Sequence, residues 1–182
     1  RGAFGEVQLN TLIRNAIPEQ HCAFQYELSN KMRVDCMLFL PEPTGNIAVD
    51  AKFPLENFQK YTSENRTPAE KQHAMTQFRQ DIRKHLKDVA MKYIIPGETS
   101  DGAILFIPAE AIFAEIHAHF PELVAESHRL RVWMVSPSTM MALLTTVRAV
   151  LKDAATQKQV HIIQEHLIAL SKDFDRFQDR ME

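Results

Sequence analysis

The sequence predicts an α/β protein with one mixed β-sheet and helices on both faces of that sheet. Short apolar segments bounded by turn-forming residues alternate with longer segments in which apolar residues recur at helical spacing. Their order along the chain is helix, three strands, helix, strand, helix, strand and helices. This order is typical of an antiparallel meander followed by crossover connections within one sheet.

The length and composition fit one globular domain. The chain has 182 residues, of which 45% are hydrophobic and 24% charged, so a sizeable core is expected. The formal net charge of −2 excludes binding of nucleic acid through overall positive charge. The sequence has no run of 18 apolar residues and no signal-peptide pattern, so we expect no membrane contact from this segment and a cytoplasmic location. Any membrane anchor would belong to flanking segments.

The first part of the chain predicts a helix and a three-stranded meander. Residues 3–17 carry an apolar face at helical spacing and end before Pro18, which stops a helix. Strands are predicted over residues 21–29, 33–40 and 46–51, with turn-forming residues between them. The third strand is short and apolar, as expected of a strand buried inside a sheet.

The remaining chain predicts alternating helices and buried strands. A Thr-Pro-Ala-Glu sequence at 67–70 predicts the start of a long helix that ends before Pro96. The segments that follow are a strand at 103–107, a helix at 108–119, a strand at 132–135, a helix from Ser136 to about Leu151 and an amphipathic helix at 155–180. We expect a single domain over 1–154 and, over 155–182, a helix that packs on the core or on a partner.

Acidic residues and a lysine gather around the predicted meander. Asp50 and Lys52 end the third strand, and residues two apart in a strand point to the same face. If the second strand pairs antiparallel with the third, Asp35 lies near Asp50. Glu6 precedes both on the first helix. Charged groups at a buried strand end require partners, because isolated buried charge is costly.

This set of residues is suited to a hard cation. Two carboxylates, Asp35 and Asp50, are typical ligands of Mg²⁺ or Mn²⁺, and Glu6 would bind a second metal ion or a metal-bound water. Lys52 would hold or activate the attacking water, or stabilise charge on a phosphate. In a chain with 23 acidic residues, roughly one Asp/Glu-x-Lys triplet is expected by chance. From the residues alone, an ordinary surface pair of Asp50 and Lys52 is therefore an equal alternative.

Several segments spread over nearly the whole chain resemble segments of the RmuC family, in the same order. One departure is Val34, where the family usually has proline. The matching segments are 2–9 (GAFGEVQL), 33–35 (RVD), 47–55 (IAVDAKFPL), 82–87 (IRKHLK), 106–110 (FIPAE) and 135–139 (VSPST) followed by Leu143-Leu144.

The resemblance implies a restriction-endonuclease-like core of the PD-(D/E)xK superfamily, with Glu6, Asp35, Asp50 and Lys52 in the site positions. It implies a Mg²⁺- or Mn²⁺-dependent deoxyribonuclease that hydrolyses phosphodiester bonds in bacterial DNA recombination and rearrangement control, associated with the nucleoid. The alternative is a non-catalytic DNA-binding or scaffold domain that keeps the fold. DNA is the expected partner, and self-association through flanking or C-terminal helices is also expected.

A basic row on the long helix is the predicted DNA-binding surface. Arg79, Arg83 and Lys87 recur every fourth residue and predict either a track for the DNA backbone or a solvated helix face. His85 lies on the other flank of the apolar stripe. In the family pattern this helix packs beside the site, so His85 is expected to contact phosphate or a metal-bound water, with a structural histidine as the equal alternative.

Overall fold

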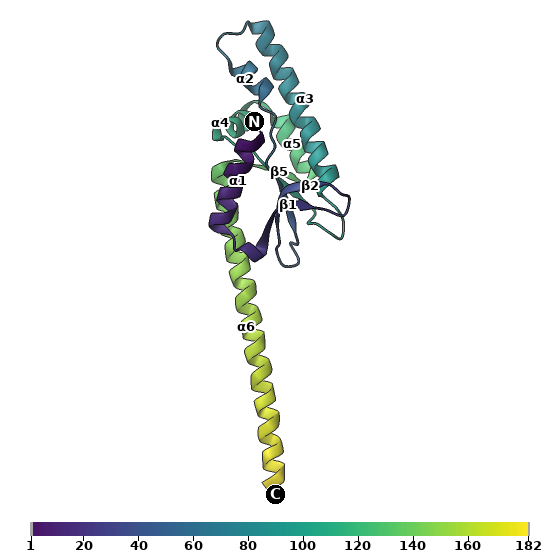
Figure 1. Cartoon of the computed structure of the whole chain (residues 1–182), viewed down its shortest axis with the longest axis vertical. Coiled ribbons are helices and arrows are strands. Elements are labelled where there is room, and N and C mark those ends of the chain that lie inside the picture. The colour runs from purple at the N-terminus through teal and green to yellow at the C-terminus, as the bar shows by residue number, and fades with distance from the viewer. Residues whose placement is uncertain (1, 182) are drawn as a thin grey trace.

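The structure is a computed structural model that describes residues 2–181; Arg1 and Glu182, the outer bounds of the two predicted domains, lie outside these residues. It confirms one mixed sheet flanked by helices (Figure 1). The strands lie in chain order, β1 to β3 antiparallel and β3 to β5 parallel. Their bounds are β1 (Cys22–Glu27), β2 (Arg33–Leu38), β3 (Ile47–Asp50), β4 (Ala103–Phe106) and β5 (Val132–Val135).

Helices cover both faces of this sheet. One face is covered by α1 (Gly2–Ala16) and the first part of α6 (Pro137–Met181), which pack together. The other face is covered mainly by α3 (Pro68–Tyr93), α4 (Glu110–His119) and α5 (Pro121–Leu130), and a short helix, α2 (Glu56–Thr62), packs on α3. A 3-10 turn, η1 (Glu19–His21), leads into β1.

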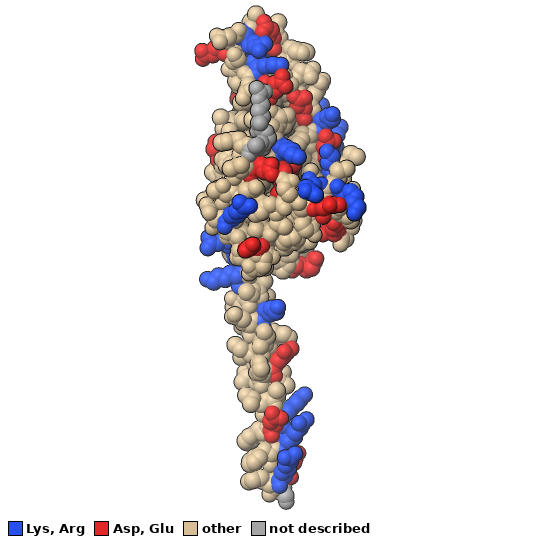
Figure 2. All heavy atoms as spheres, viewed as in Figure 1, with Lys and Arg blue, Asp and Glu red and all other residues tan. Residues whose placement is uncertain are grey.

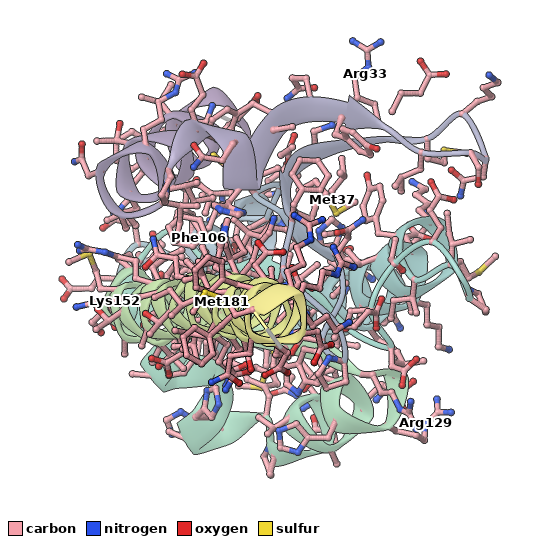
Figure 3. All side chains as sticks on the ribbon, turned by 90° about the horizontal axis from the view of Figure 1, so that it is seen from below. Arg33, Met37, Phe106, Arg129, Lys152 and Met181 are labelled. Carbon is pink, nitrogen blue, oxygen red and sulfur yellow. The ribbon has the colours of Figure 1, made fainter. Side chains whose placement is uncertain are left out.

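The strand alternation separates two apolar cores. Met37, Ala48 and Leu105 pack on the α3 side, whereas Val49 and Phe106 pack on the side of α1 and α6. Strands β3 and β4 are buried along their whole length, as their apolar sequences predict. In the view along α6, Met37 and Phe106 lie inside the body while Arg33 and Arg129 lie at its rim (Figure 3).

The long helix α3 begins where its sequence predicts. The side chain of Thr67 accepts a hydrogen bond from the backbone amide of Glu70 at 3.2 Å and so caps the first turn. One face of α3 is buried, and Phe78 at its centre packs against the rings of Phe58 and Phe120. This aromatic cluster joins α3 to α2 and to the start of α5.

Three helical segments differ from the sequence-based expectation. Helices α2 and α5 were not predicted, because both are short and neither has a side-chain hydrogen bond at its N-cap. The predicted break between the last two helices does not occur, and α6 continues from Pro137 to Met181. Residues 152–154 are Lys-Asp-Ala, and none of them stops a helix.

The second part of α6 projects away from the globular body (Figure 1). Every described residue from Ala155 onward is exposed. Among the described residues, no helix is both long enough and apolar enough to cross a membrane.

We predict that Phe78→Ala lowers the free energy of unfolding by about 3–5 kcal/mol, because it leaves a cavity inside a close-packed aromatic cluster. Urea denaturation followed by circular dichroism measures this change. Met91→Ala on the same helix is the control, since Met91 is 80% exposed, and its effect should stay within about 0.5 kcal/mol. Equal losses in the two variants would contradict the predicted packing of α3.

Candidate active site

Two buried carboxylates meet where β3 ends beside the start of β2. The antiparallel pairing of Cys36 with Val49, extended by one residue, brings Asp35 level with Asp50. Both aspartates are only 2% exposed. The structure therefore brings Asp35 and Asp50 together, as expected if the second and third strands pair antiparallel.

The Asp35 carboxylate is held by both of its oxygens. Its Oδ2 accepts a hydrogen bond from the backbone amide of Ala51 at 2.8 Å, and its Oδ1 accepts one from Nε2 of Gln25 at 3.3 Å. Burial raises the pKa of Asp35; the Ala51 hydrogen bond lowers it, the charge of Asp50 raises it further and the charge of Lys52 lowers it. The raised pKa shows that these favourable contacts do not fully offset the cost of burying the charge.

Tyr93, on α3, lies close enough to Asp35 and Asp50 for their negative charges to act on its hydroxyl. Its hydroxyl donates to the backbone carbonyl of Arg33 at 3.3 Å. Burial, followed by the charges of Asp50 and Asp35, raises the pKa of Tyr93 to about 12. The two aspartates therefore form a local centre of negative potential inside a sheet that is otherwise apolar.

Gln25 is a site residue that the sequence did not reveal. Its side-chain amide donates to Glu6 Oε1 as well as to Asp35, and so joins the first helix to the strand carboxylates. Gln25 has φ +50°, a left-handed conformation that is uncommon for a residue with a side chain. The only signal in the sequence is a polar residue between two aromatics, Phe24 and Tyr26.

The alternation of side chains between the two faces of the sheet is interrupted at Gln25. In a regular strand, residues two apart share a face. Here Phe24 and its cross-strand neighbour Cys36 pack on the side of α1, whereas Tyr26 and its neighbour Val34 pack on the side of α3. The left-handed backbone at Gln25 accompanies this reversal, which leaves the Gln25 side chain bonded to the carboxylates.

Glu6 is positioned by a close approach of α1 to the end of β3. A Cβ atom placed on Gly5 would lie 3.0 Å from the carbonyl oxygen of Ala51, a contact too short for an unstrained side chain. Glycine at position 5 therefore lets the first turn of α1 contact the backbone that follows Asp50. The structure thus brings Glu6 to the Asp35 side of the site through Gln25.

His85 and Lys52 complete the surroundings of Asp50. Nε2 of His85, on α3, lies 2.9 Å from Oδ2 of Asp50, with 23% of the His85 side chain exposed. Lys52 is exposed, and among the described residues it forms no ion pair with Asp35 or Asp50. The simple Asp50–Lys52 surface pair is thus not observed, and Asp50 is bonded to histidine instead.

The side chains around Asp35 and Asp50 fit a cation site that keeps coordination positions for water and phosphate. They fit a site closed by protein ligands alone less well. Within residues 2–181, no group of three or more His, Cys, Asp or Glu side chains is arranged to hold a metal ion. The two carboxylates Asp35 and Asp50 match the one or two that Mg²⁺ usually takes, with water and substrate phosphate as its other ligands. A structural zinc site would require four protein ligands, which these residues do not supply.

Comparison with known proteins identifies the family of this chain. A protein-family model described as RmuC family matches residues 1–182. This chain belongs to the RmuC family. A "DNA recombination protein RmuC homolog" of Chlamydia trachomatis serovar D is 29% identical over 169 residues, which are 90% of this chain and 38% of the relative. The homolog of Xylella fastidiosa strain Temecula1 is 25% identical over 199 residues, 100% of this chain and 42% of the relative.

A third relative is the "DNA recombination protein RmuC" of Escherichia coli K12, which is 24% identical over 156 residues, or 81% of this chain. The chain covers between 32% and 42% of the lengths of these three RmuC proteins. No solved structure is a significant match to the chain.

Two of the RmuC-like segments contact each other away from the carboxylates. Oε1 of Glu110 accepts a hydrogen bond from the backbone amide of Ser138 at 2.6 Å. The amide of Ile107 donates to the carbonyl of Val135 at 2.7 Å. Glu110 therefore satisfies a free amide in the first turn of α6, a structural role for this RmuC-like segment.

The basic row on α3 faces the acidic residues of α5. Nε of Arg79 lies 2.7 Å from Oε1 of Glu122, and the guanidinium lies 5.4 Å from the ring centre of Phe120. The pKa of Glu126 is lowered first by a hydrogen bond from Arg129 and less by the charges of Lys87 and Arg83. The three predicted DNA-binding cations therefore lie beside carboxylates of their own chain.

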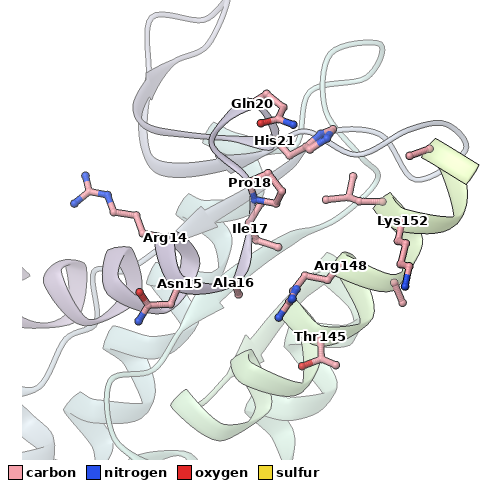
Figure 4. A pocket seen from close by; sticks show the side chains of 13 residues that line it. Arg14, Asn15, Ala16, Ile17, Pro18, Gln20, His21, Thr145, Arg148 and Lys152 are labelled. Atoms are coloured by element: carbon pink, nitrogen blue, oxygen red, sulfur yellow. The ribbon is translucent and has the colours of Figure 1, made fainter.

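A separate cavity of about 720 Å³ lies at the other end of α1, between α1, η1 and α6 (Figure 4). Arg148 and Lys152 lie one turn apart on α6, and His21 and Gln20 lie across the opening. No Asp or Glu within residues 2–181 lines this cavity. Among the described residues, neither Arg148 nor Lys152 forms an ion pair, which leaves both cations free to bind an anion.

We predict that Asp35→Asn raises the free energy of unfolding at neutral pH in a metal-free buffer. Because the pKa of Asp35 is raised in the folded state, ionisation of this carboxyl favours the unfolded chain as pH rises through that pKa. Asparagine stays uncharged, so the gain should disappear as pH falls toward the ordinary value of 3.8. Thermal unfolding of both proteins between about pH 3.5 and 8 measures this gain in stability as a function of pH.

Asp101→Asn is the control, since the Asp101 side chain is 90% exposed, and it should change stability little at any pH. A loss of stability in Asp35→Asn that does not depend on pH would show that the buried charge is not the cause.

Proposed function

We propose that this RmuC chain is a metal-dependent nuclease domain that hydrolyses phosphodiester bonds of DNA, at the nucleoid, in DNA recombination and rearrangement control. The observation that carries the proposal is the meeting of two buried carboxylates, Asp35 and Asp50, with an exposed lysine two residues further along. The names of the relatives, which are DNA recombination proteins, support DNA as the substrate. The antiparallel meander that continues into parallel strands supports a restriction-endonuclease-like core.

In this proposal the residues of the chain hold and orient the reacting groups. Asp35 and Asp50 would hold Mg²⁺ or Mn²⁺, and the bound ion would lower the pKa of a water and neutralise phosphate charge. Gln25 fixes the Asp35 carboxylate and Glu6, while His85 fixes Asp50. Lys52 is exposed beside them, where its ammonium would orient the attacking water or stabilise the charge that grows on the phosphate.

The proposed DNA path runs along α1. Glu6 lies near the start of α1, and Arg14, in the last turn of the helix, lines the basic cavity. Eight residues of helix separate Glu6 from Arg14, about 12 Å at 1.5 Å per residue. A strand held at the carboxylates would thus extend toward Arg148 and Lys152. The row of Arg79, Arg83 and Lys87 stays a predicted DNA contact. To bind a phosphate there, Arg79 would have to give up its ion pair with Glu122.

A non-catalytic DNA-binding or scaffold domain is the second candidate. Lys and Arg are interspersed with Asp and Glu over the visible face of the body, and no continuous basic surface stands out in that view (Figure 2). The absence of a three-ligand group among the described residues also favours this candidate. Turnover decides between the two, because a scaffold binds DNA without cutting it under any divalent metal.

We predict that Asp50→Asn and Lys52→Ala each lower DNA cleavage by at least about 100-fold, because each removes a charge that stabilises the transition state. A fluorescently labelled DNA incubated with Mg²⁺ or Mn²⁺ measures the rate, and EDTA should abolish it. Asp101→Asn and Lys31→Ala are the matched controls, since both residues are exposed and lie outside the site. Circular dichroism checks that all variants fold.

Cleavage that survives both Asp50→Asn and Lys52→Ala would rule out this site. DNA binding without cleavage in the unmodified chain, under either metal, would favour the scaffold candidate.

We also predict that the double variant Arg148→Ala with Lys152→Ala binds duplex DNA more weakly. Each lost phosphate contact should reduce the slope of log affinity against log salt by about 0.9. Fluorescence anisotropy at several salt concentrations measures this slope. Lys158→Ala with Lys172→Ala, on the projecting part of α6, is the matched control and should leave the slope unchanged. Equal slopes in all three proteins would exclude the cavity as a DNA contact.

A further inference from the structure

The projecting part of α6 carries a regular apolar seam that nothing in the described chain covers. Seven of its large apolar residues are spaced three and four apart in alternation, which is the a and d pattern of a coiled coil sustained over three heptads. Each of these residues is between 47% and 74% exposed. The seam residues are Val160, Ile163, Leu167, Leu170, Phe174, Phe177 and Met181.

The space-filling view shows this part of α6 as a stalk with long uncharged stretches (Figure 2). A single helix that exposes such a stripe to water gains no burial from it, and helix stability in proteins comes mainly from packing of the apolar face. We propose that the seam binds a second copy of this chain, and that the two α6 helices form an antiparallel two-helix coiled coil. This inference does not depend on the nuclease proposal.

The argument for a second copy is that the seam is complementary to itself. In an antiparallel pair, an a residue of one helix packs in a layer with a d residue of the other. Centred between Leu167 and Leu170, this pairing places Val160 against Phe177 of the second copy. It also places Ile163 against Phe174 of the second copy. Each outer layer thus combines a β-branched side chain with a phenylalanine, and the central layers combine two leucines.

A parallel pair would fill the layers unevenly. Phe174 would meet Phe174 of the second copy, and Phe177 would meet Phe177, so that four rings crowd one end of the seam. At the other end, Val160 would meet only Val160. Because cores are close-packed and both overpacking and cavities destabilise them, the antiparallel layers fit better.

The residues that flank the seam agree with the antiparallel arrangement. At the g positions, His166 of one helix lies opposite Asp173 of the second copy, and this contact occurs twice by symmetry. In a parallel pair, g residues meet e residues instead. His166 would then lie opposite Ser171, and Asp173 opposite Gln178, so neither contact would join an imidazole to a carboxylate. Among the described residues of its own chain, Asp173 has one ion-pair contact, with Arg176 at 3.9 Å, and both side chains are largely exposed.

The length and area of the seam also fit a pair of helices. Met181 of the second copy would lie level with Thr156, within the part of α6 that is fully exposed, so the described helices do not meet the globular bodies. The exposed area of the seven seam side chains is on the order of 600–1,100 Å² per chain, taking about 150–250 Å² for a fully exposed large side chain. A standard stable interface buries about 800 Å² per partner.

The first test compares two neighbouring substitutions on α6. Leu167 is 60% exposed and lies on the seam, whereas Ile168 is 58% exposed and lies at a b position beside it. Light scattering with size-exclusion chromatography and sedimentation equilibrium should give twice the chain mass for the unmodified chain and for Ile168→Glu. Leu167→Glu should give the mass of one chain, with at least about a 100-fold weaker association.

A monomeric unmodified chain at tens of micromolar would overturn the proposal. The same loss of mass in both variants, or an assembly larger than two chains, would overturn the two-helix seam. Because both residues are exposed and outside the body, circular dichroism and the thermal unfolding of the body should stay unchanged in each variant.

The second test concerns the direction of the helices. Asp173→Lys places a lysine opposite His166 of the second copy and should weaken association about three- to tenfold, and Asp173→Lys with His166→Glu should restore it. Asp175→Lys, at an outward b position of the same helix, is the control and should change association little. An Asp173→Lys variant that associates as tightly as the control would overturn the antiparallel arrangement.

Discussion

The hydrogen bond from the backbone amide of Ala51 to the carboxylate of Asp35 joins the start of β2 to the end of β3. It forms only because the two strands pair antiparallel and in a register that brings Asp35 level with Asp50. A shift of β3 by one residue would turn Asp50 to the opposite face of the sheet, into the apolar contacts of α1 and α6, and would separate it from Asp35. The site therefore depends on the register, which the buried strands maintain through their apolar residues.

The helices contribute to this centre from opposite sides of the sheet. From one side, α1 approaches the backbone at Ala51 through Gly5 and brings Glu6 to the amide of Gln25. From the other side, α3 places His85 against Asp50. The charge of the carboxylates is thus bounded by hydrogen-bond donors on two sides, and Lys52, whose charge acts on Asp35, is exposed to solvent. Such a site keeps a negative potential that a cation can neutralise, which agrees with the proposed metal dependence.

Much of the fold could be predicted because its signals are local. The apolar periodicity of α3, the capping threonine at position 67 and the short apolar strands β3 and β4 depend on residues that are close together in the sequence. The short helices α2 and α5 could not be predicted in this way, because packing against α3 stabilises them and their own caps do not. The continuous course of α6 was not expected either, although no residue at 152–154 stops a helix.

The sequence by itself determined most of the elements, the buried strand that ends at Asp50, and the RmuC-like segments. Only the tertiary structure decided that Gln25 bridges Glu6 and Asp35, and that Arg79 is paired with Glu122. These partners lie far apart along the chain, and side-chain contacts of this kind arise only after the sheet and helices have packed. A periodic pattern reports which face of an element is buried, but it carries no information about which polar group another element places against it.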